Sequence, residues 1–233
     1  MQGDKLVIGD EHRWAAGELV PMVLQALTYK GAPLVVTVAG ESGAGKSEVA
    51  FELARRLEAQ GFRTIVIQQD DYFFYPPLTN ARLRRVSLDH VGVSEVNLEA
   101  LDATVREIRG GSPRVVKPLV IYEEDRITQE ELDAAGVQVV IVEGTYTTLL
   151  PSAGLRILLE RPYHELQLAR RQRGREAQDE HLEAVLAIEH RIIAGHRERA
   201  DVAVDLSSRS VERLCSFRAK LPPGLEAGEP ARG

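Results

Sequence analysis

The stretch Gly40-Glu41-Ser42-Gly43-Ala44-Gly45-Lys46-Ser47 matches the phosphate-binding pattern G-x-x-x-x-G-K-S/T. It follows an apolar run, Leu34–Ala39, that is typical of a buried strand, and it precedes a helical pattern of apolar residues. In this context glycines let backbone N–H groups turn toward phosphate oxygens, Lys46 reaches the β- and γ-phosphates, and the Ser47 hydroxyl binds Mg²⁺. The stretch therefore predicts a loop that binds a nucleoside triphosphate.

The composition is that of one globular α/β domain. The 233 residues are 44% hydrophobic and 27% charged, which suits a substantial core. The formal net charge of −6 argues against nonspecific binding of nucleic acid. The first residues lack the basic and apolar regions of a signal peptide, and no apolar run is long enough to span a bilayer. Together with a single cysteine, Cys215, these features predict a cytoplasmic protein without a membrane partner.

Further strand patterns alternate with helical ones along the chain. They lie at Thr64–Ile67, Val137–Val142, Ile157–Leu159 and Val202–Val204. We therefore predict a doubly wound, mainly parallel five-stranded sheet of the P-loop NTPase type, with helices on both faces and a helical lid.

Three segments divide the chain in this prediction. Residues 1–33 form an N-terminal helical cover, and residues 34–220 form the P-loop domain with its lid at about 165–199. Residues 221–233 are rich in proline and glycine and are expected to be a disordered tail.

Acidic residues follow two of the predicted strands. Asp70 and Asp71 come shortly after Thr64–Ile67, and Glu143 comes directly after Val137–Val142. Because ligands of open parallel sheets lie beyond the carboxyl ends of the strands, we expect these carboxylates near the phosphate loop.

This arrangement suits phosphoryl transfer. The reaction needs neutralisation of charge on the phosphoryl oxygens and a carboxylate that takes the proton of the acceptor hydroxyl. Lys46, Mg²⁺ and the arginines of the predicted lid would supply the first, and Asp70 is the candidate for the second. The plainer interpretations are a turn after a strand for the aspartates and a solvated helix face for the arginines.

The motifs resemble the uridine kinase and phosphoribulokinase family of P-loop kinases over about residues 34–206. Besides the loop, the matching segments are Gln69–Phe73, Asp89-His90, Lys117-Pro118 with Tyr122, Glu143-Gly144, Arg170-Arg171 and Ala200–Val202. Most are weak singly, but their order and spacing together are specific.

The resemblance implies a nucleoside-kinase-like fold and a kinase that moves the γ-phosphoryl group of ATP to a hydroxyl of a small molecule, often the ribose 5-hydroxyl. It implies that Asp70 is the general base, assisted by Lys46 and by the lid residues Arg170, Arg171 and Arg173. It implies a metal site of Ser47, Asp70 and Glu143. The acceptor contacts that it implies are Asp70, Phe73, Asp89, His90, Tyr122 and Arg126.

The chain departs from the family pattern at the acceptor end. Glu123–Arg126 follows Tyr122 where uridine and cytidine kinases usually have a histidine, and Phe73 stands where they commonly have tyrosine. Gln167 replaces an arginine that often precedes the lid pair, and the stretch from Arg171 to Ala200 is shorter than usual.

Several alternatives therefore stay open. The doubled Asp70-Asp71 followed by aromatic residues is similar to nicotinamide riboside kinases. A sugar phosphate or a pantothenate-like alcohol would suit the basic residues Arg82, Arg84 and Arg85. A nucleotide-switch NTPase is a remote alternative, because the guanine motif N-K-x-D is absent. The choice between Asp70 and Asp71 as base, the use of GTP and the formation of a homo-oligomer are also open.

Overall fold

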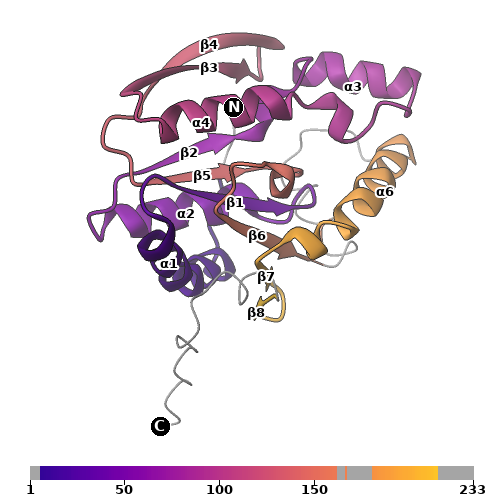
Figure 1. Cartoon of the computed structure of the whole chain (residues 1–233). Helices are drawn as coiled ribbons and strands as arrows, with labels where there is room; N and C mark the ends of the chain where they lie inside the picture. The colour runs from indigo at the N-terminus through magenta and orange to yellow at the C-terminus, as the bar shows by residue number, and fades with distance from the viewer. Residues whose placement is uncertain (1–5, 162–165, 167–179, 215–233) are drawn as a thin grey trace.

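Six strands form one twisted sheet in the part of the chain that this computed structural model describes, residues 6–161, 166 and 180–214 (Figure 1). Their order across the sheet is β2-β5-β1-β6-β7-β8. The bounds are Leu34–Gly40 for β1, Thr64–Gln68 for β2, Val139–Glu143 for β5, Leu155–Glu160 for β6, Val202–Asp205 for β7 and Ser210–Arg213 for β8.

The predicted mainly parallel five-stranded sheet is confirmed. The pairs β2–β5, β5–β1, β1–β6 and β6–β7 are all parallel. Every residue of β1 and of β5 is buried, as expected for strands covered on both faces. The structure adds β8, an antiparallel edge strand that the sequence pattern did not predict.

Two hydrophobic cores cover the two faces of this sheet. Because successive side chains of a strand point to opposite faces, Leu34, Val36 and Val38 of β1 enter one core, whereas Val35 and Ala39 enter the other. The first core contains α1 (Asp10–Lys30) and α2 (Lys46–Glu58), and the second contains α4 (Leu98–Arg109). Helices therefore lie on both faces, as predicted.

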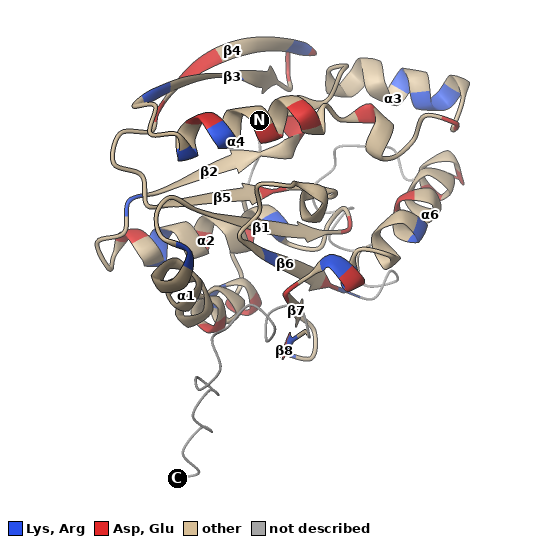
Figure 2. Cartoon of the chain, in the orientation of Figure 1, with Lys and Arg blue, Asp and Glu red and all other residues tan. Residues whose placement is uncertain are grey.

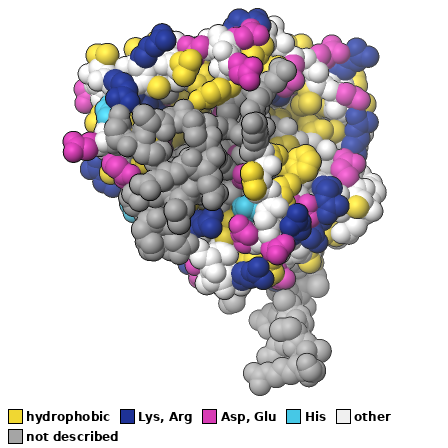
Figure 3. All heavy atoms as spheres, turned by 180° about the vertical axis from the view of Figure 1, so that it is seen from behind, with side chains coloured by type: hydrophobic (Ala, Val, Ile, Leu, Met, Phe, Trp, Pro, Cys, Tyr) yellow, Lys and Arg dark blue, Asp and Glu magenta, His cyan; other side chains and the backbone are white. Residues whose placement is uncertain are grey.

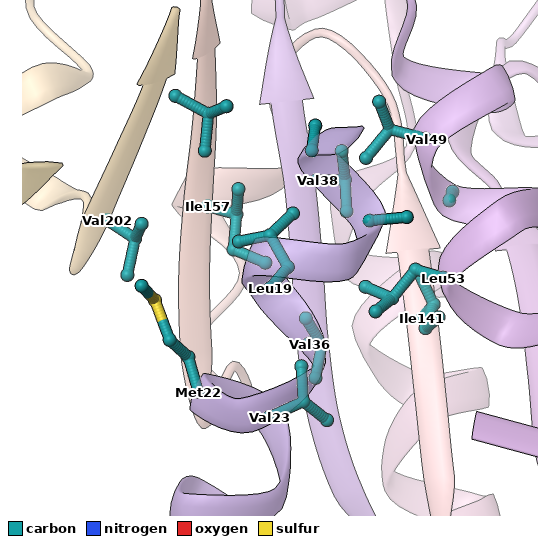
Figure 4. Close-up of a cluster of buried hydrophobic side chains, with 14 of the residues drawn as sticks. Leu19, Met22, Val23, Val36, Val38, Val49, Leu53, Ile141, Ile157 and Val202 are labelled. Carbon is teal, nitrogen blue, oxygen red and sulfur yellow. The ribbon is translucent and has the colours of Figure 1, made fainter. Parts of the chain in front are cut away.

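The N-terminal helix α1 is part of the first core. Its residues Leu19, Met22 and Val23 pack with Val36, Ile157 and Val202 of the sheet (Figure 4). A helix was expected at these residues, and its buried face makes it continuous with the P-loop domain. The segment boundaries after residues 33 and 220 stay a prediction, and residues 221–233 lie outside the described residues.

A separate antiparallel hairpin of β3 (Arg114–Ile121) and β4 (Arg126–Asp133) was not predicted. It lies over α4, at the side of the sheet where β2 is the edge strand (Figure 1). Its turn is held by the Asp125 carboxylate, which accepts hydrogen bonds from the backbone N–H groups of Leu78 (2.7 Å) and Thr79 (3.1 Å) at the start of α3 (Pro77–Val86). The hairpin turn and the start of α3 are thereby joined.

The remaining elements lie between and after these. They are the 3₁₀ turns η1 (Gln69–Tyr72), η2 (Val93–Glu95), η3 (Thr147–Leu149) and η4 (Arg197–Arg199), and the helix α6 (Glu180–Ala194). The helix α6 falls within the predicted lid, while residues 162–165 and 167–179 of that segment lie outside the described residues.

Charged side chains are spread over the outside of the fold. Figure 2 shows them mainly on the helices and the hairpin, with few on the central strands. On the face seen in Figure 3, basic and acidic side chains are intermixed with hydrophobic ones. Of the described helices, none combines the length and the apolarity needed to cross a membrane.

Candidate active site

The phosphate loop connects β1 to α2 at the carboxyl end of the sheet. Lys46 and Ser47 form the first turn of α2, and Gly45 precedes them with a φ of +90°, in the left-handed region that favours glycine. The backbone N–H groups at this helix start have no partner within the helix, so they can bind phosphate oxygens. The backbone at the start of α2 is thus suited to binding phosphate.

The rear of this loop is supported by α1. A Cβ atom at Gly45 would lie 2.7 Å from His12 Nε2, so the buried His12 ring packs directly on the loop. The ring is held in place because its Nδ1 accepts a hydrogen bond from the Gly9 backbone N–H at 2.9 Å. No sequence motif pointed to His12. The contact joins two segments that are far apart in the sequence, and a local pattern does not report such a contact.

Polar groups from β2, β5 and the start of α2 meet at this edge of the sheet. Strand pairing places Glu143 beside both Val38 of β1 and Gln68 of β2. One Glu143 carboxylate oxygen, Oε1, accepts hydrogen bonds from Ser47 Oγ (3.0 Å) and Gln68 Nε2 (3.2 Å). Lys46 is buried, and its Nζ donates to the Glu41 carbonyl at 2.9 Å.

The carboxyl group of Glu143 has a strongly perturbed pKa. It is raised to about 7, first by burial and then by the negative charge of Asp70, while Lys46, Ser47 and Gln68 oppose the rise. The negative charge of Asp70 and the positive charge of Lys46 therefore both act on the Glu143 carboxyl group, in opposite directions.

This raised pKa predicts a pH dependence of stability. The folded protein binds the Glu143 proton more tightly than the unfolded chain, so the stabilisation is complete below the ordinary value of 4.5 and is lost as the pH rises through about 7. We therefore expect the free energy of unfolding, measured by urea titration without Mg²⁺, to contain a component that falls over this pH window. The component should be absent in Glu143→Gln, and an unchanged pH profile in that variant would contradict the assignment.

The two aspartates after β2 have different surroundings. Asp70 is partly exposed, whereas Asp71 is buried and accepts hydrogen bonds from Lys117 Nζ (2.8 Å) and the Val120 backbone N–H (2.9 Å). Gly144 permits the close approach of β5 to η1, because a Cβ atom there would lie 2.3 Å from the Gln69 Cβ. The side chain of Asp71 is therefore bound to the hairpin through both of its oxygens. No hydrogen bond of this kind holds the Asp70 side chain to the described part of the hairpin.

Apart from Asp70, the predicted acceptor residues lie in the segment from η1 to η2 and at the turn of the β3–β4 hairpin. Phe73 is half-buried and forms a bridge with Val96, while Asp89 is exposed in the connection from α3 to η2. The Nε2 atom of His90, in the same connection, is buried without a hydrogen-bond partner. Tyr122 is half-buried at the hairpin turn.

The predicted arginines of the site fall into two groups, those outside the described residues and one that the structure places. Arg170, Arg171 and Arg173 lie outside the described residues. Arg126 is exposed and forms an ion pair with Glu124 at 2.7 Å.

Arg84 is engaged in a buried ion pair. Its Nε and Nη2 atoms contact the Glu95 carboxylate at 2.6 and 2.9 Å, and Nη2 also contacts Glu189 of α6 at 3.2 Å. Burial alone would raise the pKa of Glu95, but Arg84 and the hydrogen bonds from Gly92 and Asn80 hold it below its ordinary value. Arg84 therefore links α3, η2 and α6 rather than facing open solvent.

The phosphate loop also contacts α6. His190 Nδ1 lies 2.6 Å from Oε1 of Glu41, the second residue of the loop. The sequence placed Glu41 in the nucleotide site but did not indicate that its side chain connects the loop to α6.

The donor set fits Mg²⁺ and a triphosphate. Ser47, Asp70 and Glu143 offer oxygen atoms, which Mg²⁺ prefers, and Mg²⁺ is usually held by one or two carboxylates together with phosphates and water. The Lys46 ammonium, which donates to the Glu41 carbonyl within the loop, can pair with phosphate oxygens.

Comparisons with known proteins identify the family of this chain. A model of the phosphoribulokinase/uridine kinase family matches residues 35–188. A uridine kinase of Ureaplasma parvum serovar 3 is 27% identical over 143 residues, which is 59% of this chain and 67% of that protein. A uridine kinase of Latilactobacillus sakei is 25% identical over 191 residues, which is 76% of this chain and 87% of that protein.

Solved structures with similar folds include a putative fructose transport system kinase from Silicibacter sp., at a TM-score of 0.59 and 21% identity, covering 85% of this chain and 96% of that one. Phosphoribulokinase from Rhodobacter spheroides matches at a TM-score of 0.56 and 16% identity, covering 74% of this chain and 69% of that one. At these identities the likeness concerns the fold alone.

Proposed function

Because this chain belongs to the phosphoribulokinase/uridine kinase family, we propose that it transfers the γ-phosphoryl group of ATP to the ribose 5-hydroxyl of a nucleoside. Membership of the family makes the chain an ATP-dependent phosphotransferase with an alcohol group as acceptor. The nucleoside and the position of its hydroxyl are the proposed part, and the uridine kinases among the relatives support them.

The observation that supports this proposal most directly is the placement of Asp70. Its charge acts on Glu143, which is hydrogen-bonded to Ser47 at the start of α2. A carboxylate here can accept the proton of an alcohol as the phosphoryl group is transferred, because the proton leaves late in a loose transition state. Both carboxylate oxygens of Asp71 are bound, to Lys117 and to the Val120 N–H, and this favours Asp70 over Asp71 as the base.

We propose the following roles for the other residues. We assign triphosphate binding to the backbone of Gly40–Ser47 and to Lys46, and ligation of Mg²⁺ to Ser47, Asp70 and Glu143. When bound, Mg²⁺ would neutralise charge on the phosphate oxygens. The residues Phe73, Asp89, His90, Tyr122 and Arg126 are proposed to contact the acceptor, and the lid residues Arg170, Arg171 and Arg173 to cover the phosphates. We also propose a cytoplasmic location.

The surroundings of Arg84 weaken the case for an acidic acceptor. A sugar phosphate would need cations that are available to its phosphate, and Arg84 is instead enclosed by Glu95 and Glu189. The hairpin turn carries the acidic residues Glu123, Glu124 and Asp125, which would repel a second phosphate.

A coupled assay of ADP release tests the proposed function. It compares uridine, cytidine, nicotinamide riboside, ribulose 5-phosphate and pantothenate, each with Mg²⁺ and ATP. We expect ADP formation that depends on a nucleoside, and ³¹P NMR of the product should show a 5-phosphate ester. Turnover with ribulose 5-phosphate or pantothenate alone would contradict the nucleoside assignment, and ADP formation independent of every acceptor would contradict the kinase mechanism.

A further inference from the structure

A buried ion pair connects η1 to the β3–β4 hairpin. Lys117 Nζ of β3 lies 2.8 Å from Asp71 Oδ2, and the two side chains are 4% and 2% exposed. The second carboxylate oxygen of Asp71, Oδ1, accepts the Val120 backbone N–H at 2.9 Å. Both oxygens of Asp71 are therefore bound to the same strand.

The hairpin in turn holds Lys117. The residue opposite it on β4 is Glu130, whose carboxylate lies 2.6 Å from Nζ, and Nζ also donates to the Pro118 carbonyl at 3.0 Å. An ammonium group has three N–H donors, and these contacts with Asp71, Glu130 and Pro118 use all of them. Lys117 is thus a structural cation rather than one that awaits a ligand.

The ion pair lies next to the candidate active site. A cavity of about 310 Å³ is lined by Lys117 and Asp71 together with Ser47, Gln68 and Glu143. In a 3₁₀ turn, with three residues per turn, consecutive side chains point about 120° apart. Because the Asp71 side chain points toward the hairpin, the Asp70 side chain must point about 120° away from that direction.

We propose that Lys117 is a positioning residue that, by holding the Asp71 carboxylate, keeps η1 and therefore Asp70 in place at the end of β2. The inference rests on the proposed function, because it takes Asp70 as the base. Loss of the Lys117 cation would leave a buried carboxylate without its partner, and because an unpaired buried charge is strongly destabilising, we expect Asp71 to shift from this position. Asp71 would take η1 with it, and a shift of about 1 Å in a reacting group lowers turnover by about 100-fold.

The proposal makes a specific prediction about two variants. Lys117→Met should lower kcat by about 10- to 100-fold and should change the Kd of Mg·ATP much less, because the phosphate loop is not altered. The double variant Lys117→Met with Asp71→Asn should recover most of the lost kcat. The asparagine side chain is neutral, so it needs no cation, and its amide oxygen can still accept the Val120 N–H.

The matched control is Arg114→Met. Arg114 pairs with Glu131 at 2.9 Å on the same hairpin, but both side chains are exposed, at 72% and 55%. Removal of this cation should leave kcat unchanged, since exposed ion pairs contribute little. All variants are made in the full chain, and thermal unfolding verifies that each is folded.

The measurements are ADP release with the best acceptor of the panel and hydrogen exchange of the peptide that contains residues 69–73. Exchange should be faster in Lys117→Met and should return toward the wild-type rate in the double variant, and this readout does not require a known acceptor. A folded double variant with kcat and exchange no better than Lys117→Met would overturn the proposal, as would wild-type behaviour of Lys117→Met. If Lys117→Met alone does not fold, the kcat and the hydrogen exchange of the double variant, each compared with the wild type, test the proposal.

Failure of the proposed function would give a different result from failure of this inference. In that case Asp70→Asn would retain the wild-type rate of ADP formation, whatever the variants of Lys117 do to hydrogen exchange.

Discussion

Asp70→Asn is expected to lower kcat by about 10²- to 10⁴-fold, the range for loss of a positioned general base. The substitution keeps the size of the side chain but removes its ability to take the acceptor proton. Because Asp70 lies outside the phosphate loop, the Kd of ATP should change much less than kcat. Steady-state assays of ADP release and calorimetric titration with a nonhydrolysable ATP analogue measure the two quantities.

A surface carboxylate provides the control for this prediction. Asp133 pairs with Arg63 at 2.7 Å, and its side chain is 70% exposed, so Asp133→Asn should turn over at the wild-type rate. Wild-type turnover of Asp70→Asn would move the role of base to Asp71 or Glu143. Asp71 is the less suitable of these two, because both of its carboxylate oxygens are occupied by Lys117 and the Val120 N–H.

Lys46→Ala is expected to lower kcat/KM by about 10²- to 10³-fold and to weaken ATP binding at the same time. The Lys46 ammonium is buried at the start of α2 and lies close enough to Glu143 to affect its pKa. The ammonium can therefore stabilise the negative charge of bound ATP and also the negative charge that develops on the phosphate oxygens during transfer.

The control for this second prediction is Lys30→Ala, at the exposed end of α1. This variant should bind ATP as the wild type does. If Lys46→Ala changed the KM of the acceptor alone, the assignment of Gly40–Ser47 to the triphosphate would be wrong.

The sequence was sufficient for the parallel sheet and for the position of the phosphate loop. Central strands such as Val139–Glu143 are continuous apolar runs, and the loop pattern is short, so both are visible within a few neighbouring residues. The rule that ligands bind beyond the carboxyl ends of parallel strands then placed Glu143 and the aspartates at one edge.

The hairpin was missed for a physical reason. Its strand β3 contains Pro118, which argues against a strand, and β4 carries mainly polar residues because much of it faces solvent. Its stability comes from cross-strand pairs and from the Asp125 contact with α3, which join residues far apart in the sequence. Local patterns do not report such contacts.

What the sequence alone determined is the fold class and the set of polar groups at the sheet edge, because backbone preference and hydrophobic periodicity act over short distances. Only the tertiary structure decided how these groups differ. It buried Asp71 against Lys117, enclosed Arg84 between two carboxylates and raised the pKa of Glu143. Burial and charge pairing depend on which distant residues come together, and so adjacent aspartates of the same chemistry acquire different surroundings.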